Sequence, residues 1–263
     1  TNDLFESNMD MFEAARNSYE QFFGFTSTLT GDGPKLNAGI DMFAEVIAFL
    51  TDNFGLGLGF GYTQRTAEGD IALTTIVPGF GNVVEGWKAE PKIAVPSLLL
   101  SAHYFYPLME KLNIFFNAGI GLYFGTESWE GSLSYASPLY TEMSTETATF
   151  NGTAVGFHGG FGAEFKVNSN ISFFVEGRGR AATIKSLKGD RDYLSFDGES
   201  SKESGTIWYV DSPFEELNIE MIEYRVQDTK PDDPWLQNVR KWEVKLSGIS
   251  GVVGIRILFG KKS

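Results

Sequence analysis

The sequence predicts an all-β fold, in which eight antiparallel strands close into a barrel that spans a membrane. The chain of 263 residues contains 30 glycines, 23 phenylalanines and 10 tyrosines, and this composition favours strands and tight turns over helices. No window approaches the ~18 uninterrupted apolar residues that mark a transmembrane helix. Long segments alternate apolar residues with small or polar ones, and the connections between them are short and long in turn. Short turns on one side and long loops on the other are typical of bacterial outer-membrane barrels.

A polar segment, residues 1–17, precedes the predicted barrel. Phe5, Met9 and Phe12 recur in it at helical spacing. We expect a short amphipathic helix there, at the periplasmic interface or at the mouth of the barrel. Because the chain starts at Thr1, without a methionine or a signal peptide, we also expect a processed, exported protein.

The barrel is expected to occupy residues 18–259. Each predicted strand is at least as long as the ~9–11 residues that a tilted strand needs to cross a bilayer, whereas strands average only ~5–6 residues in soluble proteins. The last strand changes phase between Trp242 and Val253, so we expect a β-bulge near Gly248–Gly251. The eight strands are predicted near 18–29, 38–50, 54–65, 92–106, 112–126, 152–167, 171–186 and 240–259.

The connections predict the orientation of the barrel. With eight strands, both termini fall on the periplasmic side, where the short turns lie. Three short polar turns are predicted at 51–53, 107–111 and 168–170, and four long extracellular loops over 30–37, 66–91, 127–151 and 187–239.

The two faces of the predicted strands differ in polarity. In the third strand Leu58 and its alternate neighbours are apolar, whereas glycines occupy every second position from 55 to 61. In the seventh strand Phe173 opposes Glu176 and Arg178. Glycines and charges suit the cramped polar interior of a small barrel, so the apolar face is predicted to point outward, towards lipid.

The last strand carries a family resemblance. Val253, Ile255 and Ile257 alternate with other residues up to Phe259, and this end resembles the C-terminal targeting strand of outer-membrane barrels, except that a tail, 260–263, follows the aromatic residue. From 18 to 259 the chain resembles the OmpA/OmpX/OmpW-like outer-membrane β-barrel superfamily. The resemblance implies a place in the bacterial outer membrane, in contact with its lipid and lipopolysaccharide. It does not imply an activity.

A group of ionisable residues is predicted to face the barrel interior. Register places Asp41 diagonal to Arg65 and His158 opposite Arg180. Because buried charges persist only when they are paired, we expect a salt-bridge network that plugs the lumen. The alternative is a narrow polar conduit gated by an exchange of ion pairs, although eight strands leave little room for water. The predicted network comprises Asp41, Glu45, Arg65, His103, His158, Glu164, Glu176, Arg178 and Arg180, with Arg256 as a further candidate.

The two histidines do not suggest catalysis. An outer-membrane acyltransferase or lipase needs a histidine beside a serine or an aspartate at the outer leaflet. His103 lies four residues before the periplasmic turn at Pro107, and His158 lies near mid-height without a clear serine partner. We therefore predict that the protein is not an enzyme, and that it has neither catalytic residues nor a cofactor.

The last long loop, 187–239, is strongly acidic. Between Lys188 and Val239 it has 13 acidic and 5 basic residues. Segments 206–210 and 216–226 look like strands, so we expect a hairpin within the loop, above the membrane. Its aromatic residues either form a binding surface or pack onto the barrel rim. The predicted surface comprises Trp208, Tyr209, Phe214, Tyr224 and Trp235.

The same loop contains candidate ligands for a metal ion. Asp190, Asp192, Asp197 and Glu199 offer oxygen ligands for calcium, but their spacing matches no EF-hand, and no metal is predicted.

These observations favour a non-enzymatic outer-membrane protein. It is expected to act through its extracellular loops, in envelope structure, adhesion or the binding of a protein or surface partner. The alternative is an OmpW-like passage for small molecules. A net charge of −13 argues against a nucleic-acid partner.

Overall fold

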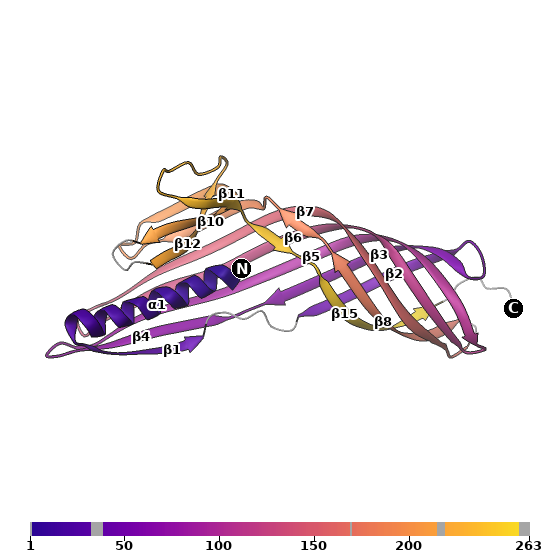
Figure 1. Ribbon diagram of the computed structural model, residues 1–263, viewed down its shortest axis with the longest axis horizontal. Helices are drawn as coiled ribbons and strands as arrows, with labels where there is room; N and C mark the ends of the chain where they lie inside the picture. Colours follow the sequence, from indigo (N-terminus) through magenta and orange to yellow (C-terminus); the bar gives the residue numbers. More distant parts are fainter. Residues whose placement is uncertain (1, 33–38, 169, 215–218, 258–263) are drawn as a thin grey trace.

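The computed structural model describes residues 2–32, 39–168, 170–214 and 219–257 as one helix and a large antiparallel sheet (Figure 1). In this part of the chain no helix is long and apolar enough to cross a membrane. The helix α1 spans Asn2–Phe23. The strands are β1 (Thr26–Asp32), β2 (Ile40–Phe49), β3 (Phe54–Thr66), β4 (Gly69–Val77), β5 (Gly81–Met109), β6 (Leu112–Ala136), β7 (Thr141–Lys166), β8 (Ile171–Ala181), β9 (Thr183–Lys185), β10 (Lys188–Leu194), β11 (Ser200–Phe214), β12 (Ile219–Gln227), β13 (Gln237–Lys241), β14 (Glu243–Lys245) and β15 (Gly248–Ile257).

The sheet is not closed, and the prediction of an eight-stranded barrel is wrong. Of the strands described, thirteen form one sheet and the short β9 and β14 form another. Seven of the thirteen pair in the order β2-β3-β5-β6-β7-β8-β15. No pairing joins β2 to β15 within the described ranges. We call one part of this sheet the curved section. It consists of β2, β3, β8 and β15, together with the halves of β5, β6 and β7 that lie next to the short turns.

The missing eighth strand is explained by the start of the chain. The predicted strand 18–29 is mostly wrong, because α1 continues to Phe23 and ends at Gly24, whose positive φ of 64° is typical of a helix C-terminus. The helix is held by packing, since Phe12 is buried against Ile71 and Leu73. The short β1 then pairs with β4 and cannot join β15.

The two predicted loops 66–91 and 127–151 are wrong as well. They continue as hairpins, so that β5 has 29 residues, β6 has 25 and β7 has 26. At ~3.3 Å per residue, β5 is roughly 95 Å long. Their threonines and tyrosines are polar but favour strands, and each strand has a partner, so the ladder continues beyond the apolar part.

The segment 187–239 is part of the sheet and not a separate loop. β10 pairs with β7, β11 with β10, and β12 with β11. The predicted hairpin in this segment is confirmed by the pairing of β11 with β12. These strands, with α1, β1, β4, β13 and the far halves of β5, β6 and β7, make up what we call the extension.

The predicted last strand, 240–259, is interrupted just before the predicted bulge, between β14 and β15. β15 pairs with β8 in regular register from Gly248 to Ile257, so the bulge at Gly248–Gly251 is wrong. The phase changes because the chain leaves the large sheet: β14 pairs with β9 instead. The β9–β14 pair packs on the inner face of β5, β6 and β7, where Ile184 and Val244 join a buried apolar core.

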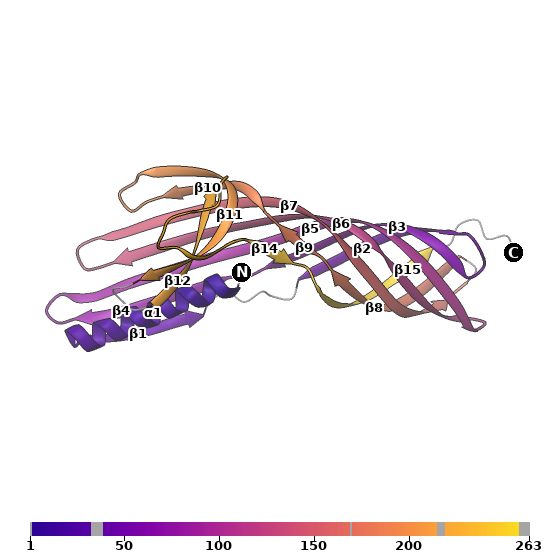
Figure 2. The same ribbon diagram turned by 45° about the horizontal axis from the view of Figure 1, so that its top comes forward.

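The helix and the last strand lie at opposite ends of the sheet. Figures 1 and 2 show α1 along the extension, and Tyr19 of the helix bonds to Glu85 there. β15 instead ends beside Ile171, next to the short turn between β7 and β8. The prediction that the N-terminal segment lies on the short-turn side, as the C-terminal strand does, is therefore wrong. Because the curved section has an odd number of strands, the chain enters it at the end next to the extension and leaves it at the end next to the short turns.

The predicted polarity of the two faces is confirmed in the curved section. Phe116 and Phe173 are each 53% exposed and Val253 is 81% exposed, all on the outer face. Glu164 and Glu176 are buried on the inner face, at 2% and 3%. The arrangement is the reverse of a soluble sheet, which hides its apolar face.

Candidate functional site

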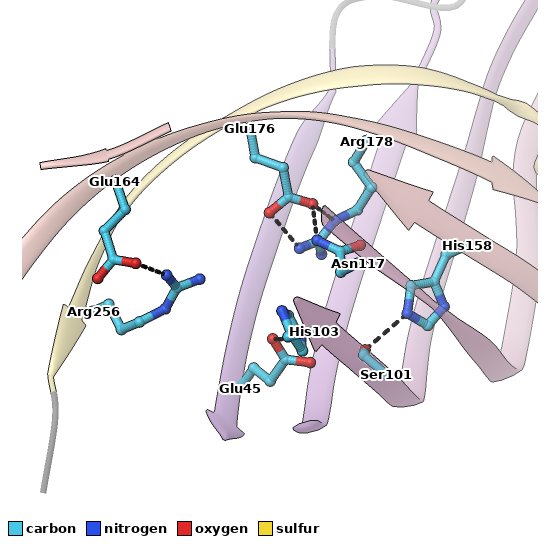
Figure 3. A network of polar contacts seen from close by, with 9 residues as sticks. All are labelled: Glu45, Ser101, His103, Asn117, His158, Glu164, Glu176, Arg178 and Arg256. Carbon is cyan, nitrogen blue, oxygen red and sulfur yellow. Dashed lines mark hydrogen bonds and ion pairs between the residues drawn. The ribbon is translucent and has the colours of Figure 1, made fainter. Parts of the chain in front are cut away.

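The interior of the curved section holds a network of ionisable side chains (Figure 3). Nearest the short turns, Arg256 of β15 lies with its Nη1 2.5 Å from Oε2 of Glu164 on β7. Ser172 of β8 donates a hydrogen bond to the same carboxylate. The guanidinium also lies 4.8 Å from the ring centroid of Phe115, so aromatic rings surround a fully paired charge.

A second cluster crosses the interior from β8 to β2. Arg178 makes a bidentate contact with Glu176, with distances of 2.7 and 2.9 Å. Asn117 of β6 donates to the same carboxylate at 3.0 Å. The Arg178 guanidinium lies 3.9 Å from the ring centroid of Phe43 on β2. Side chains therefore bridge strands that do not pair through their backbones.

A third cluster explains why one face of β3 consists of glycines. Glu45 of β2 and His103 of β5 lie 3.0 Å apart, with side chains only 6% and 2% exposed. A Cβ on Gly57, which lies between them on β3, would come within 2.3 Å of Glu45 Oε1 and 3.0 Å of His103 Nε2. The absence of a side chain at this position makes room for the pair.

The fourth contact joins His158 to a serine that the sequence interpretation missed. Ser101 Oγ lies 3.0 Å from His158 Nε2, and both residues are buried. The signal was available in the register, because Ser101 pairs with Gly119 and Gly119 with His158. Among the described side chains, His158 Nδ1 has no hydrogen-bond partner. The acid that orients the histidine in a serine hydrolase is therefore missing from this pair.

The network ends beside a cavity of about 340 Å³. The predicted neighbours Asp41 and Arg65 form an ion pair of 3.3 Å. Arg180 pairs in register with His158, as predicted, but its side chain donates to Thr63 Oγ1 at 2.8 Å. The cavity reaches the outer face between the edge strands, since outward-facing residues of β2 and β15 line it together with these charged side chains.

The predicted aromatic surface is divided by the structure. Trp208 and Tyr209 are buried, at 8% and 6% exposed, and Tyr209 stacks on Trp242 with centroids 4.2 Å apart. Tyr224 is half-buried and packs against the same core. Trp235 is 48% exposed. The Phe214 side chain lies outside the described residues.

The buried aromatic core around Tyr209 also contains residues that the sequence interpretation assigned to loops. Trp129 stacks on Trp242, and the Trp242 indole donates to Glu127 at 2.6 Å. Glu146 accepts a hydrogen bond from Arg191 at 2.6 Å. Burial opposes the charge of Arg191, but the attraction of Glu146 outweighs it and raises the pKa of that guanidinium.

Three of the four acidic residues that offer oxygen ligands for calcium have other partners. Asp190 accepts a hydrogen bond from Ser204, and Asp192 lies 3.6 Å from Lys202. The pKa of Asp197 is lowered by the hydrogen bond that it accepts from Ser195. Over the described ranges, no three histidine or acidic side chains are grouped as metal ligands would be.

Comparisons with known proteins add no assignment. No family model matches the chain, and neither a curated protein nor a solved structure matches it. The function must therefore be inferred from the geometry of the two faces, the interior network and the extension.

Proposed function

We propose that the protein is an integral membrane protein of the bacterial outer membrane, with the curved section in the bilayer and the extension in water outside the cell. It serves there as a non-enzymatic anchor, whose extension contributes to envelope structure or binds a partner. One observation carries the proposal: the outer face of the curved section carries no charged side chain on any of the seven strands and is apolar apart from polar residues at its rim, such as Gln64 of β3. A soluble protein rarely exposes so large an apolar patch.

The apolar face has the height of a bilayer. On β6 the outward residues run from Ile114 to Phe124 without a polar side chain, and then change to Thr126, Ser128 and Glu130. Ten residue steps of strand are about 33 Å long, or ~23 Å when tilted by ~45°. This value matches the ~25 Å apolar band of outer-membrane proteins.

The neighbouring strands change at the same level. Outward residues of β7 are apolar from Phe165 to Val155 and polar from Thr153 to Thr145. Val155 pairs with Leu122, so the boundary continues across the two strands. At the other end of the face, Tyr104 and Tyr106 point outward near the short turns, where aromatic residues gather at a membrane interface.

The edge strands set a condition on this proposal. β2 and β15 each pair on one side only within the described residues, and a free edge in hydrocarbon leaves backbone groups without partners. The edges must therefore be covered in the bilayer. The chain has no cysteine, so a double variant, Ala44→Cys with Gly251→Cys, can show what covers the two edges. An intramolecular disulfide would form if the edges meet each other, and an intermolecular disulfide would form if a second copy covers them. Absence of both disulfides, together with rapid amide exchange along both edges, would contradict the placement.

The test of the membrane assignment compares two lysine substitutions on one strand. Ile120→Lys places a charge in the middle of the apolar face and should abolish assembly into outer membranes or liposomes. Ser128→Lys, on the same face of β6 but beyond the boundary, should leave assembly unchanged. Fractionation and heat-modifiability on gels measure both. A purified protein that is monomeric in water without detergent, with Ile120→Lys as well folded as the parent, would overturn the proposal.

One observation favours the alternative, a passage for small molecules. The cavity of about 340 Å³ opens between β2 and β15 beside Arg180. The paired charges and the apolar core on either side of it favour a closed interior. Planar-bilayer recordings distinguish the two functions: the anchor should give no steady current, whereas a passage should conduct.

A further inference from the structure

We propose that the extension binds an organic ammonium ion in a cavity between α1 and the hairpin formed by β6 and β7. The cavity has a volume of about 490 Å³, which lies within the range of small-molecule sites. Its lining comes from α1, β5, β6, β7 and the turn between β10 and β11. The site is outside the curved section, so the proposal does not depend on the membrane assignment.

Two carboxylates give the cavity its charge. Glu85 on β5 pairs in register with Tyr135 on β6, which pairs with Glu142 on β7. Residues directly opposite one another project to the same face of a sheet, so the three side chains are neighbours. Among the described residues neither glutamate forms an ion pair, and the one basic residue of α1, Arg16, bonds to Asn17.

The charge of Glu85 is poorly compensated. The Tyr19 hydroxyl donates to Glu85 Oε1 at 3.1 Å. Burial nevertheless raises the pKa of Glu85 above its usual range, although this hydrogen bond opposes the shift. The pKa of Tyr19 is raised to about 12, first by burial and then by the charge of Glu85. A partly buried carboxylate without a cation favours the entry of a positive ligand, because the ligand would neutralise it.

Aromatic rings determine the kind of cation. Tyr135 and Tyr140 stack with their centroids 5.5 Å apart, and both line the cavity with Tyr19 and Phe196. The faces of such rings attract alkylated ammonium groups. Leu133 and Phe12 supply further apolar surface. Calcium prefers six to eight oxygen ligands, with carboxylates foremost, whereas this lining has only two carboxylates among aromatic and apolar side chains, so an alkylated ammonium ion fits better than a metal.

The experiment measures the binding of choline to the full chain by isothermal titration calorimetry. The protein is kept in a maltoside detergent, because zwitterionic detergents carry ammonium groups of their own. The matched probe is 3,3-dimethylbutan-1-ol, which has the shape of choline without its charge. We expect choline to bind at least tenfold more tightly than the neutral alcohol. Equal binding of the two, or no binding of choline at millimolar concentrations, would overturn the proposal.

Variants locate the site. Glu85→Gln keeps the shape and should weaken choline binding at least fivefold, whereas Glu130→Gln, a control carboxylate on the outer face of β6, should have no effect. Tyr135→Leu should also weaken binding, and Tyr135→Phe should retain it because the ring remains. A loss with Glu130→Gln equal to that with Glu85→Gln would show only general attraction to an acidic protein and would refute a site at Glu85.

Discussion

The curved section and the extension share three strands but reverse their polarity. In the half of β6 near the short turn, Phe116 faces outward and Asn117 inward; further along, Ser128 faces outward and Trp129 packs inward against the apolar core. The reversal lies where the apolar band ends, near Phe124. A continuous strand can thus change its surroundings without changing its backbone, because a period of two assigns every second residue to the same face throughout. Strand geometry alone therefore does not select which face is apolar; under the proposed membrane placement, the medium around each region selects it.

The two regions also differ in how they treat charge. In the curved section, Glu164 and Arg256 are buried together, with side chains 3% and 11% exposed. In the extension, Asp70 and Lys88 form an ion pair with side chains more than half exposed. Only the first pair is removed from water. Removing one partner of that pair therefore leaves a buried, unpaired charge and lowers the stability of the fold, whereas removing one partner of the exposed pair does not.

The largest expected effect comes from breaking the buried pair. Arg256→Ala leaves Glu164 buried and unpaired and should lower the free energy of unfolding by about 3–5 kcal/mol. Lys88→Ala, the matched change in the extension, should cost less than about 1 kcal/mol. Urea titration in detergent, followed by tryptophan fluorescence, measures both. If the two variants unfold at the same urea concentration, the buried pair contributes no more to stability than the exposed pair, and the prediction is wrong.

A double variant sharpens the interpretation. Glu164→Leu with Arg256→Met removes both charges and should recover most of the stability, because a desolvated ion pair is often no better than apolar side chains of similar size. If the double variant is as unstable as Arg256→Ala, the loss arises from packing and not from the unpaired charge.

A second comparison uses glycines. A Cβ on Gly119, in the curved section, would meet Leu100 O at 2.1 Å and His158 Nε2 at 2.8 Å, whereas one on Gly131, in the extension, would meet only Lys88 O at 3.5 Å. Gly119→Ala should therefore cost about 1–3 kcal/mol. Gly131→Ala should be neutral or stabilising by up to about 1 kcal/mol, because alanine suits a strand better than glycine. Equal melting temperatures for both variants would contradict the crowding of the interior.

The faces and many interior residues could be predicted from the sequence, since strand alternation is a local property. Glu176 and Arg178 are two residues apart and must share a face wherever the strand lies. The ends of the strands could not be predicted in the same way. Polar alternation around Ser128 is equally compatible with a loop until a pairing partner is known. The prediction that the sheet closes into a barrel was wrong for a similar reason. The helix at the start of the chain is stabilised by the packing of Phe12, and this packing exists only in the folded chain.

The contacts between clusters required information that one strand does not contain. Ser101 and His158 meet through the registers of two successive hairpins, so an error in either turn would separate them. Arg178 reaches Phe43 through the curvature of the whole sheet. The aromatic core of the extension was missed because Trp129 was assigned to a loop.

The smallest expected effect concerns Glu85 and separates stability from binding. Because burial raises its pKa, the folded protein holds the proton more tightly than the unfolded chain does. Stability from this group is therefore fully present below the unfolded pKa and is lost as the pH rises through the folded pKa. At neutral pH, Glu85→Gln should raise the free energy of unfolding by less than about 1 kcal/mol, since water screens a partly exposed carboxylate.

The matched variant for this prediction is Glu142→Gln, which removes an exposed carboxylate at the same cavity and should leave stability unchanged. Urea titrations at pH 4 and pH 7.5 provide the measurement, and the gain from Glu85→Gln should disappear at the lower pH because the parent glutamate is then protonated too. A substitution that strengthens the fold but weakens choline binding indicates a side chain retained for its ligand, because a residue kept for stability alone would lose both together. A loss of stability in Glu85→Gln at pH 7.5 would instead place this carboxylate with the structural ion pairs of the curved section.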